Sequence, residues 1–379
     1  MKHMNKYLLR IVKIISFIFL FLAALYVLQD YVLCHLDHNR LRLDGYYLEE
    51  ENSIDVVFTG ASEAYSDFVP ALAYKKYGFT SFPYASASAT AGASITQIKE
   101  IERTQDPQLI VMEINPFLYP DNRNETKEGS IRNYIDNVPL NDNKMEYIKS
   151  LDIANEAEYY FPLIKYHSSW SEYPGGIKFL GALIQQHLRG YTFLKGYKSN
   201  TGYCENDGTY LNERLITDDK ELPLTDDSDK KLRDLLDYLN ENDIKNVLFI
   251  RAPHLVRQND YGSFCMANYA GRIIQEYGFD FLNFERDPIT MSYTPDEYYN
   301  IQHLNIYGSA KFTEYLGDIL TKKYRIKKSD LSERQAEHWN QSIYYYRKLY
   351  RCVDAMNQEG SKMVEIEEDL YGMHMLEKY

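Results

Sequence analysis

The stretch Ile54-Asp55-Val56-Val57-Phe58-Thr59-Gly60-Ala61-Ser62-Glu63 holds the pattern from which the fold can be inferred. Its first six residues are mostly apolar, which is typical of a short buried strand. At Gly60 and Ala61 the strand should turn sharply into a helix. A serine on such a turn projects its hydroxyl beyond the strand end, toward a ligand rather than into a core. Ser62 is therefore a candidate nucleophile.

Further apolar runs at 109–114, 247–251 and 279–284 predict three more strands. Isoleucines at helical spacing precede the run at 109, and leucines at helical spacing precede the run at 247, behind an expected N-cap at Ser228. Alternation of short strands with helices predicts an α/β fold. Helical crossovers imply parallel strands, whose carboxyl ends carry the functional site.

His303 lies about 240 residues after Ser62, in a loop that leads into an amphipathic helix. A serine needs a base to act as a nucleophile at neutral pH, and histidine is the usual base. A turn serine and a surface histidine are each common, so either residue alone would carry little weight. The two contexts together favour acyl chemistry.

Composition limits the class of protein. The chain has 379 residues, of which 45% are apolar and 26% charged, as in globular proteins. Its net charge of −13 argues against a nucleic-acid partner. The four cysteines, Cys34, Cys204, Cys265 and Cys352, have no metal-ligand spacing, and no disulfide can be assigned from them.

The N-terminus predicts a membrane anchor over residues 11–29. Residues 11–28 are apolar except for Lys13 and Ser16, and basic residues precede the run while Gln29 and Asp30 follow it. This asymmetry predicts that residues 1–10 are cytoplasmic and that the rest is extracytoplasmic. A cleaved signal peptide is the alternative, although no small-x-small site follows the run cleanly.

The chain divides into an expected main domain over residues 45–322 and a peripheral helical tail over 323–379. Residues 120–225 interrupt the alternation with frequent Asn, Asp, Tyr and Gly, which predicts a helical and loop insertion over the sheet.

Two blocks resemble the SGNH (GDSL-type) hydrolases, in the membrane-anchored branch of bacterial cell-envelope O-acylation that includes the D-alanyl transfer protein of teichoic acid modification. Gly60-Ala61-Ser62-Glu63 resembles the first block, and His303-Leu304-Asn305 with Gly308 resembles the last. Further similarity lies in Phe161-Pro162-Leu163, Tyr166-His167, Trp170 and Lys195-Gly196-Tyr197. The resemblance implies a three-layer α/β/α, flavodoxin-like domain.

This chain departs from the family pattern at three places. Asn300 stands where the family has an aspartate three residues before its histidine. The second block, residues 84–89, has no glycine until Gly92. Asn115 follows the third strand, but in Glu113-Ile114-Asn115-Pro116 rather than the usual Gly-x-Asn-Asp.

The resemblance implies a role for each site residue. Ser62 would attack an ester with His303 as base, and Asn300 would orient the imidazole without stabilising its charge. Ser86, Asn115 and the Ser62 N–H are candidates for stabilising the oxyanion. Glu63 could supply a missing carboxylate, as could Asp296. Arg251 and His254, past a strand end, are candidates for substrate binding.

The sequence therefore favours an anchored acyl esterase or O-acyltransferase that acts on a cell-surface glycopolymer. Its partner would be a membrane-bound O-acyltransferase, and no metal or organic cofactor is needed. The alternative is a degenerate SGNH-like domain that binds the acyltransferase or the polymer without turnover. Asn300 and the missing glycine favour that alternative, whereas the presence of both Ser62 and His303 disfavours it.

Overall fold

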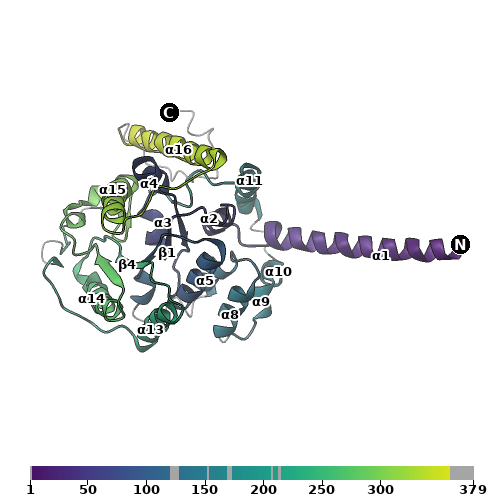
Figure 1. Cartoon of the computed structure of the whole chain (residues 1–379), viewed down its shortest axis with the longest axis horizontal. Helices are drawn as coiled ribbons and strands as arrows, with labels where there is room; N and C mark the ends of the chain where they lie inside the picture. Colours follow the sequence, from purple (N-terminus) through teal and green to yellow (C-terminus); the bar gives the residue numbers. More distant parts are fainter. Residues whose placement is uncertain are drawn as a thin grey trace.

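A computed structural model describes residues 2–119, 128–151, 153–168, 173–205, 208–211 and 215–358. Its centre is a five-stranded parallel sheet with the strand order β2-β1-β3-β4-β5 (Figure 1). The strands are β1 (Val56–Gly60), β2 (Ser81–Ala85), β3 (Leu109–Glu113), β4 (Val247–Arg251) and β5 (Asp280–Asn283). The prediction of an α/β fold with a parallel sheet is confirmed.

The strand β2 is absent from the sequence-based prediction. It carries Pro83, which has no N–H to donate and is confined to edge strands or bulges. In the structure β2 pairs only with β1 and forms one edge of the sheet, so a proline is tolerated there. A separate two-stranded hairpin, also not predicted, consists of β6 (Tyr298–Asn300) and β7 (His303–Leu304).

Helices cover both faces of the sheet, because alternate strand residues point to opposite sides. Val57, Met112 and Phe249 pack with α2 (His38–Tyr47), α5 (Ser94–Thr104), α13 (Asp226–Glu241) and α14 (Tyr261–Glu276). Phe58 and Val111 pack with α3 (Ser62–Ser66), α4 (Pro70–Tyr77) and α15 (Ile306–Lys322). The leucines of α13 are fully buried, and each contributes about 1.5–3 kcal/mol.

The cap of α13 differs from the expectation. Thr225, not Ser228, is the N-cap, and its side chain accepts a hydrogen bond from the Ser228 N–H. Thr225 thereby satisfies the Ser228 N–H, one of the unpaired donors of the first turn, and the helix begins three residues earlier than predicted.

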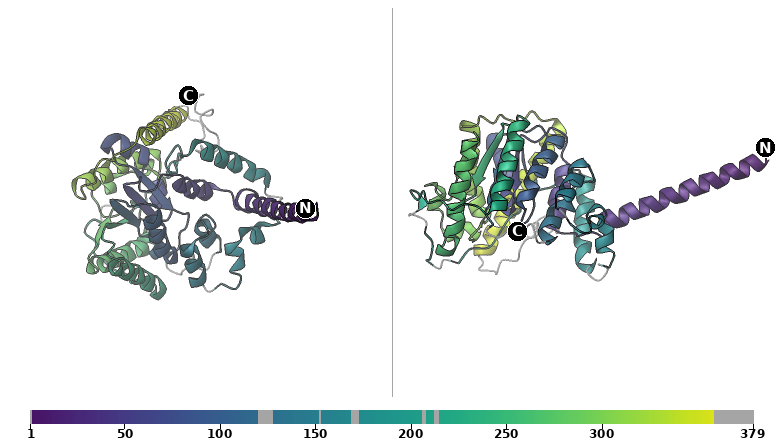
Figure 2. Two further views of the ribbon diagram at one scale, coloured as in Figure 1. Left: turned by 45° about the vertical axis from the view of Figure 1, so that its right-hand side comes forward. Right: turned by 90° about the horizontal axis from the view of Figure 1, so that it is seen from below.

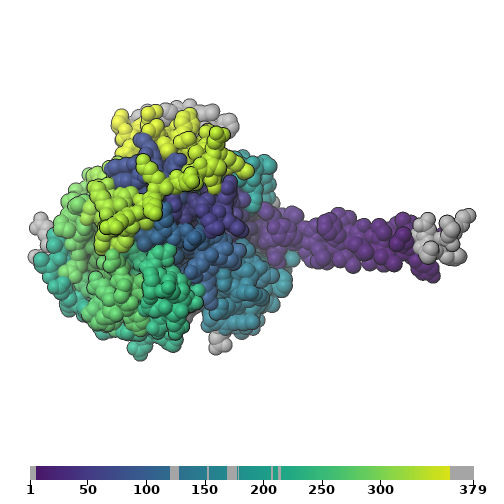
Figure 3. Space-filling view, viewed as in Figure 1, coloured from purple at the N-terminus to yellow at the C-terminus, as the bar shows by residue number. Residues whose placement is uncertain are grey.

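The chain between β3 and β4 carries several helices, and a long helix follows α15. The former are α7 (Glu128–Ile135), α8 (Asp142–Ser150), α9 (Ala157–Tyr160), α10 (Pro162–Tyr166) and α11 (Tyr173–Arg189). The latter, α16 (Glu333–Gln358), lies across α4 and buries Tyr345, Leu349 and Val353 (Figures 1 and 3). It is therefore a packed helix. Residues 359–379 of the expected tail lie outside the described residues.

The N-terminal helix α1 (Lys2–Val27) stands clear of the rest of the molecule (Figures 1 to 3). A π-helical segment, Leu28–Val32, continues it, and residues Lys6–Val32 are long and apolar enough to cross a membrane. The chain then enters α2, which packs on the sheet domain. A signal sequence has the same length and composition, so the alternative of cleavage stays open.

Candidate active site

Gly60 makes the turn between β1 and α3 that presents Ser62. Its φ of +126° lies in a region open to glycine, and a Cβ there would come 2.7 Å from the carbonyl oxygen of Glu113 on the neighbouring strand. Two independent constraints therefore require glycine. Ser62 is the first residue of the short helix α3, at the carboxyl edge of the sheet.

Ser62 and His303 are in direct contact. The hairpin β6–β7 carries His303 to the same edge, and its Nε2 lies 2.8 Å from Ser62 Oγ. Behind it, His303 Nδ1 lies 3.0 Å from Asn300 Oδ1. Serine, histidine and asparagine thus form a continuous hydrogen-bonded line, whose first two members are 241 positions apart in the sequence.

Asn300 fixes which ring nitrogen of His303 carries the proton. Its Oδ1 also accepts hydrogen bonds from the backbone N–H groups of Gln302 (2.9 Å) and His303 (3.0 Å). Only an oxygen can accept from two backbone donors, so the amide is oriented with Oδ1 toward the ring. His303 Nδ1 must then be the donor, which leaves the lone pair of Nε2 facing the Ser62 hydroxyl.

Asp67 and Asn305 hold the histidine loop in place. Asp67, buried at the end of α3, accepts a hydrogen bond from the Leu304 N–H at 3.0 Å. Burial raises the pKa of the Asp67 carboxyl well above its usual value. Asn305 caps α15 by accepting from Tyr307 N and Gly308 N. Both residues therefore position His303 through the backbone that follows it.

A buried polar cluster lies directly behind Ser62. The Asn115 amide donates to Glu63 Oε1 at 2.6 Å, while Asn115 Oδ1 accepts from Arg251 at 2.8 Å. Arg251 also contacts Glu285 at 2.9 Å. His254 lies between two carboxylates, 2.8 Å from Glu285 and 3.6 Å from Glu63. The Ser62 hydroxyl lies 3.3 Å from Glu63 Oε2.

The charges of this cluster balance internally. Burial and Arg251 lower the pKa of His254, but Glu285 and Glu63 outweigh them and raise it to about 9. Burial opposes ionisation of Glu63, yet His254, His303 and Arg251 hold its pKa below the usual range. Burial also opposes ionisation of Glu285, but Arg251 and His254 hold the pKa of its carboxyl below the usual value. Two cations therefore face two carboxylates.

Glu113 is the neutral member of the cluster. Burial, followed by the charge of Glu63, raises the pKa of its carboxyl to about 8. Its Oε2 accepts from the Asn115 N–H at 2.8 Å, and Arg251 lies 3.6 Å from its Oε1. The protonated form avoids a third buried negative charge beside Glu63 and Glu285.

His303 is set up to act as a base. Burial, His254 and Lys198 lower the pKa of its imidazole, whereas Glu63 raises it, and the net direction is downward. The ring is therefore neutral at pH 7. Glu63 is the ionised carboxylate on the serine side of the ring, and it favours the imidazolium that forms when Ser62 gives up its proton.

The loop after β2 borders the serine. Gly60 pairs with Ala85, so Ser86 extends one step past the sheet beside Ala61. The Ser86 side chain is buried, and its Oγ has no hydrogen-bond partner among the described residues. The Ala87 N–H already donates to Asn39 Oδ1. The Ser62 N–H, at the start of α3, has no partner four residues back within its helix.

The structure thus sorts the residues singled out in the sequence. Ser62, His303, Asn300 and Ser86 gather at one edge of the sheet. Asn115, Glu63, Arg251 and His254 are there too, but they bind one another: the Arg251 guanidinium is neutralised by Glu285 rather than left for a substrate. Asp296 is exposed, and its backbone carbonyl accepts from the Asn305 amide. Trp170 lies outside the described residues.

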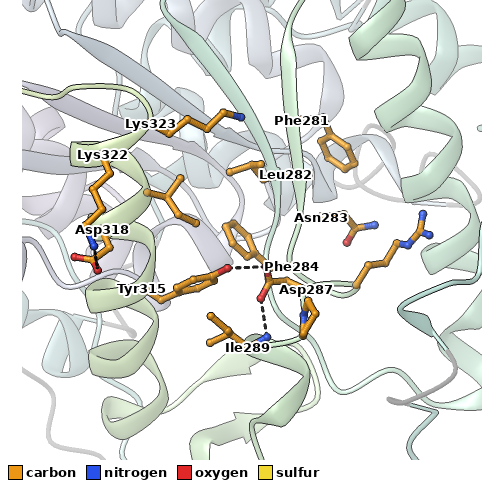
Figure 4. Close-up of a pocket in the computed structure, with 13 residues that line it drawn as sticks. Phe281, Leu282, Asn283, Phe284, Asp287, Ile289, Tyr315, Asp318, Lys322 and Lys323 are labelled. Carbon is orange, nitrogen blue, oxygen red and sulfur yellow. Dashed lines mark hydrogen bonds and ion pairs between the residues drawn. The ribbon is translucent and has the colours of Figure 1, made fainter.

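Hollows of different sizes border the sheet domain. A small cavity of about 80 Å³ adjoins the cluster, with apolar walls at Leu118, Leu255 and Ile301 and polar walls at His254 and Gln302. A larger pocket of about 710 Å³ lies between β5 and α15 (Figure 4). In it Tyr315 donates to Asp287, and the pocket shares no residue with the Ser62–His303 site. Within the described residues no His, Cys, Asp or Glu cluster has the arrangement of metal ligands.

Comparisons of this chain with protein-family models, curated proteins and solved structures found no match.

Several residues of the site carry no recognisable signal in the sequence. Glu285 follows β5 and Asp67 ends α3, and each is one of many acidic residues in a chain with 55. Their roles depend on which strands are neighbours, because β5 lies beside β4 and thereby brings Glu285 to Arg251. The order of the strands, rather than a motif, selects them.

Proposed function

We propose that the chain is a membrane-anchored extracytoplasmic SGNH-like enzyme that acts on acyl esters of a cell-surface glycopolymer through an acyl-Ser62 intermediate. The contact of 2.8 Å between Ser62 Oγ and His303 Nε2, with the ring tautomer set by Asn300, carries the proposal. A three-layer arrangement is consistent with helices on both faces of the sheet.

The reaction has two steps. Ser62 Oγ attacks the ester carbonyl and forms a new C–O bond, while its proton passes to His303 Nε2. The bond to the polymer oxygen then breaks, and His303 returns the proton to that oxygen. Water or a sugar hydroxyl next attacks the acyl-serine, gives its proton to His303, and Ser62 takes it back. Attack by water gives hydrolysis, and attack by a sugar hydroxyl gives acyl transfer.

The oxyanion of each step needs donors outside the Asn115 side chain, whose amide is bonded to Glu63 and Tyr119. The Ser62 N–H and the Ser86 hydroxyl are the donors that we assign to it. Ser86 Oγ is buried and unpartnered beside the turn, which is an arrangement that a developing negative charge would satisfy.

Binding without turnover is the second candidate. Asn300 favours it, because an uncharged partner stabilises the imidazolium less than an aspartate does. The neutral His303 ring, its tautomer and the ionised Glu63 nearby favour catalysis. A membrane-bound O-acyltransferase could supply the acyl group in either case.

Covalent labelling of the full-length chain in detergent tests the proposal. A fluorophosphonate should form a stable adduct on Ser62, seen by mass spectrometry of the peptide, because it needs the same activated oxygen and oxyanion donors. Ser62→Ala should abolish the adduct, and His303→Ala should slow it by about 10²–10⁴-fold. Ser150→Ala, at an exposed helical serine, is the control. Labelling that is equal in wild type and His303→Ala would contradict a dyad.

The polymer is tested in cells. A strain with Ser62→Ala should change the amount of surface O-acyl ester relative to wild type at equal protein abundance. Loss of ester would indicate transfer, and accumulation would indicate hydrolysis. If the amount of surface O-acyl ester is unchanged and Ser62 is not labelled by the fluorophosphonate, only the binding function remains.

A further inference from the structure

Exposed apolar side chains are concentrated in one part of the domain. Outside α1, eleven large apolar or tyrosine side chains of the described residues are exposed, and six of them lie between residues 140 and 188. These six are Leu140, Phe161, Ile164, Ile177, Ile184 and Leu188. Leu188 is the most exposed of the six, at 83%. A group of exposed apolar side chains in one region indicates an interaction surface.

Helix α11 is apolar on two opposite faces. Phe179, Ala182 and Leu183 pack against Leu41 of α2. Ile177, Ile184 and Leu188 recur at intervals of seven and four residues, so they form one stripe on the other side of the helix. That stripe is exposed. The outer face of a helix in a soluble domain is usually polar, whereas on α11 the exposed Gln185 and His187 only flank this apolar stripe.

Helices α10 and α11 both contact the chain where α1 meets the sheet domain. Tyr31 and Leu36, at the end of the apolar segment, pack into the cluster of α11. His35 stacks on Tyr166 of α10, with ring centroids 6.2 Å apart. Figures 1 and 2 show α11 running across the axis of α1 rather than along it. A helix crosswise to a membrane span lies along the bilayer surface.

We propose that α10 and α11 form a seating surface, made of Phe161, Ile164, Ile177, Ile184 and Leu188, which inserts into the interfacial layer of the bilayer that α1 spans. Apolar faces of helices in this orientation bury about 5–10 Å into the boundary between headgroups and acyl chains. The occupant is lipid because α10 and α11 both contact Leu28–Val32, the last residues of the segment that is apolar enough to span a membrane. The inference goes beyond the proposed chemistry and does not depend on it.

The seating surface has a consequence for substrate. Ala87, in the loop beside the serine, accepts from Asn133 of α7 and donates to Asn39 of α2. The loop beside the serine is thus tied to α2, the first helix after the apolar segment Lys6–Val32. A domain held flat on the bilayer keeps Ser62 at a fixed height above it. This consequence, unlike the seating surface itself, rests on the proposed function: the esters that Ser62 reaches are those presented at the membrane surface.

Depth measurements on the full-length chain test the seating surface. The chain, with Cys34→Ser and Cys204→Ser, is placed in nanodiscs of phosphatidylcholine and phosphatidylglycerol and given one nitroxide at Ile184→Cys or Leu188→Cys. Power saturation compares collisions with oxygen, which concentrates in lipid, and with a soluble nickel chelate. At both positions oxygen collisions should exceed nickel collisions. The control, Ile289→Cys, is also 50% exposed but follows β5, and there the ratio should invert.

A nickel-dominated signal at Ile184 and Leu188 would overturn the proposal, and so would low accessibility to both reagents, which indicates a protein contact. The double variant Ile184→Glu/Leu188→Glu adds a second readout, since a nitroxide at Ile177→Cys should then shift toward the nickel-accessible state. Fluorophosphonate labelling of Ser62 should be unchanged in this variant. A failed seating surface with intact labelling, or the reverse, separates this inference from the proposed function.

Discussion

In the proposed reaction, Asn300 is the residue at which this site departs from a Ser–His–Asp triad. An asparagine in the place of a triad aspartate lowers kcat by about 10⁴ in serine proteases, largely because it holds the histidine in the wrong tautomer. Here two backbone N–H groups orient Oδ1 toward the ring, so the tautomer is correct and only the negative charge is missing. The deficit should be correspondingly smaller.

Asn300→Asp should therefore raise hydrolysis of a small aryl acetate by roughly tenfold to a hundredfold, well below the protease effect. The added carboxylate also raises the pKa of His303, because it favours the imidazolium. The wild-type rate should fall as the pH drops through a His303 pKa below the ordinary histidine value, and in the variant that fall should move to higher pH. Stopped assays across pH 4–9 measure the hydrolysis rate and the pH at which it falls. Asn300→Leu, which removes the hydrogen-bond acceptor of His303 Nδ1, should lower the rate. A variant with an unmoved pH limb would contradict the assignment of His303 as base.

Glu113 links the buried cluster to stability at alkaline pH. Its folded pKa is raised to about 8, so the fold favours the protonated form. That contribution is complete at acid pH and is lost as the pH rises from the ordinary carboxyl value through 8. Glu113→Gln mimics the protonated form and should remove this loss. The difference in Tm between variant and wild type should grow from pH 5 to pH 8 and then level off; Glu51→Gln, at an exposed position, should show no such trend.

At the scale of elements, the β1–α3 turn is the most constrained part of the fold. Gly60→Ala puts a Cβ 2.7 Å from the Glu113 carbonyl oxygen and a side chain at φ +126°. We expect a loss of about 1–3 kcal/mol in the free energy of unfolding for the backbone conformation alone. Urea titration measures it. Gly262→Ala, in α14 with no atom near the added Cβ, is the matched control and should not destabilise.

The link between α3 and β7 positions the histidine. Asp67→Asn keeps an acceptor for the Leu304 N–H, and burial, which raises the pKa of the native carboxyl, already disfavours its charged form. This variant should keep its kcat within a few fold, whereas Asp67→Ala should lower kcat with little change in KM. Equal losses in both variants would indicate that the charge of Asp67, rather than its hydrogen bond, matters.

Local patterns identified the parts of the site that depend on a few consecutive residues. Ser62 follows an apolar run and a glycine, and the leucines of α13 have a clear helical period, so both were predictable. The strand β2 was not, since Pro83 disqualifies a strand unless its place at an edge is known. The ion pair between Arg251 and Glu285 was also not predicted, because the order of the strands is not known from the sequence. It follows from the pairing of β4 with β5, and a side chain that looks free in the sequence is neutralised by its neighbour.

At the scale of the whole molecule, the charges that flank α1 predict an orientation across the membrane. Basic residues precede the apolar run, whereas Gln29 and Asp30 follow it. The N-terminus should therefore stay in the cytoplasm, and the sheet domain should lie outside. In a background with Cys34→Ser and Cys204→Ser, a membrane-impermeant maleimide should label Lys220→Cys on intact cells. It should label Asn5→Cys only after the cells are opened. Lys220 is exposed in the folded domain, so access there reports the side of the membrane rather than burial. Labelling of Asn5→Cys but not Lys220→Cys on intact cells would reverse the topology. A surface glycopolymer would then be out of reach of Ser62, and the proposed substrate would fall with the orientation.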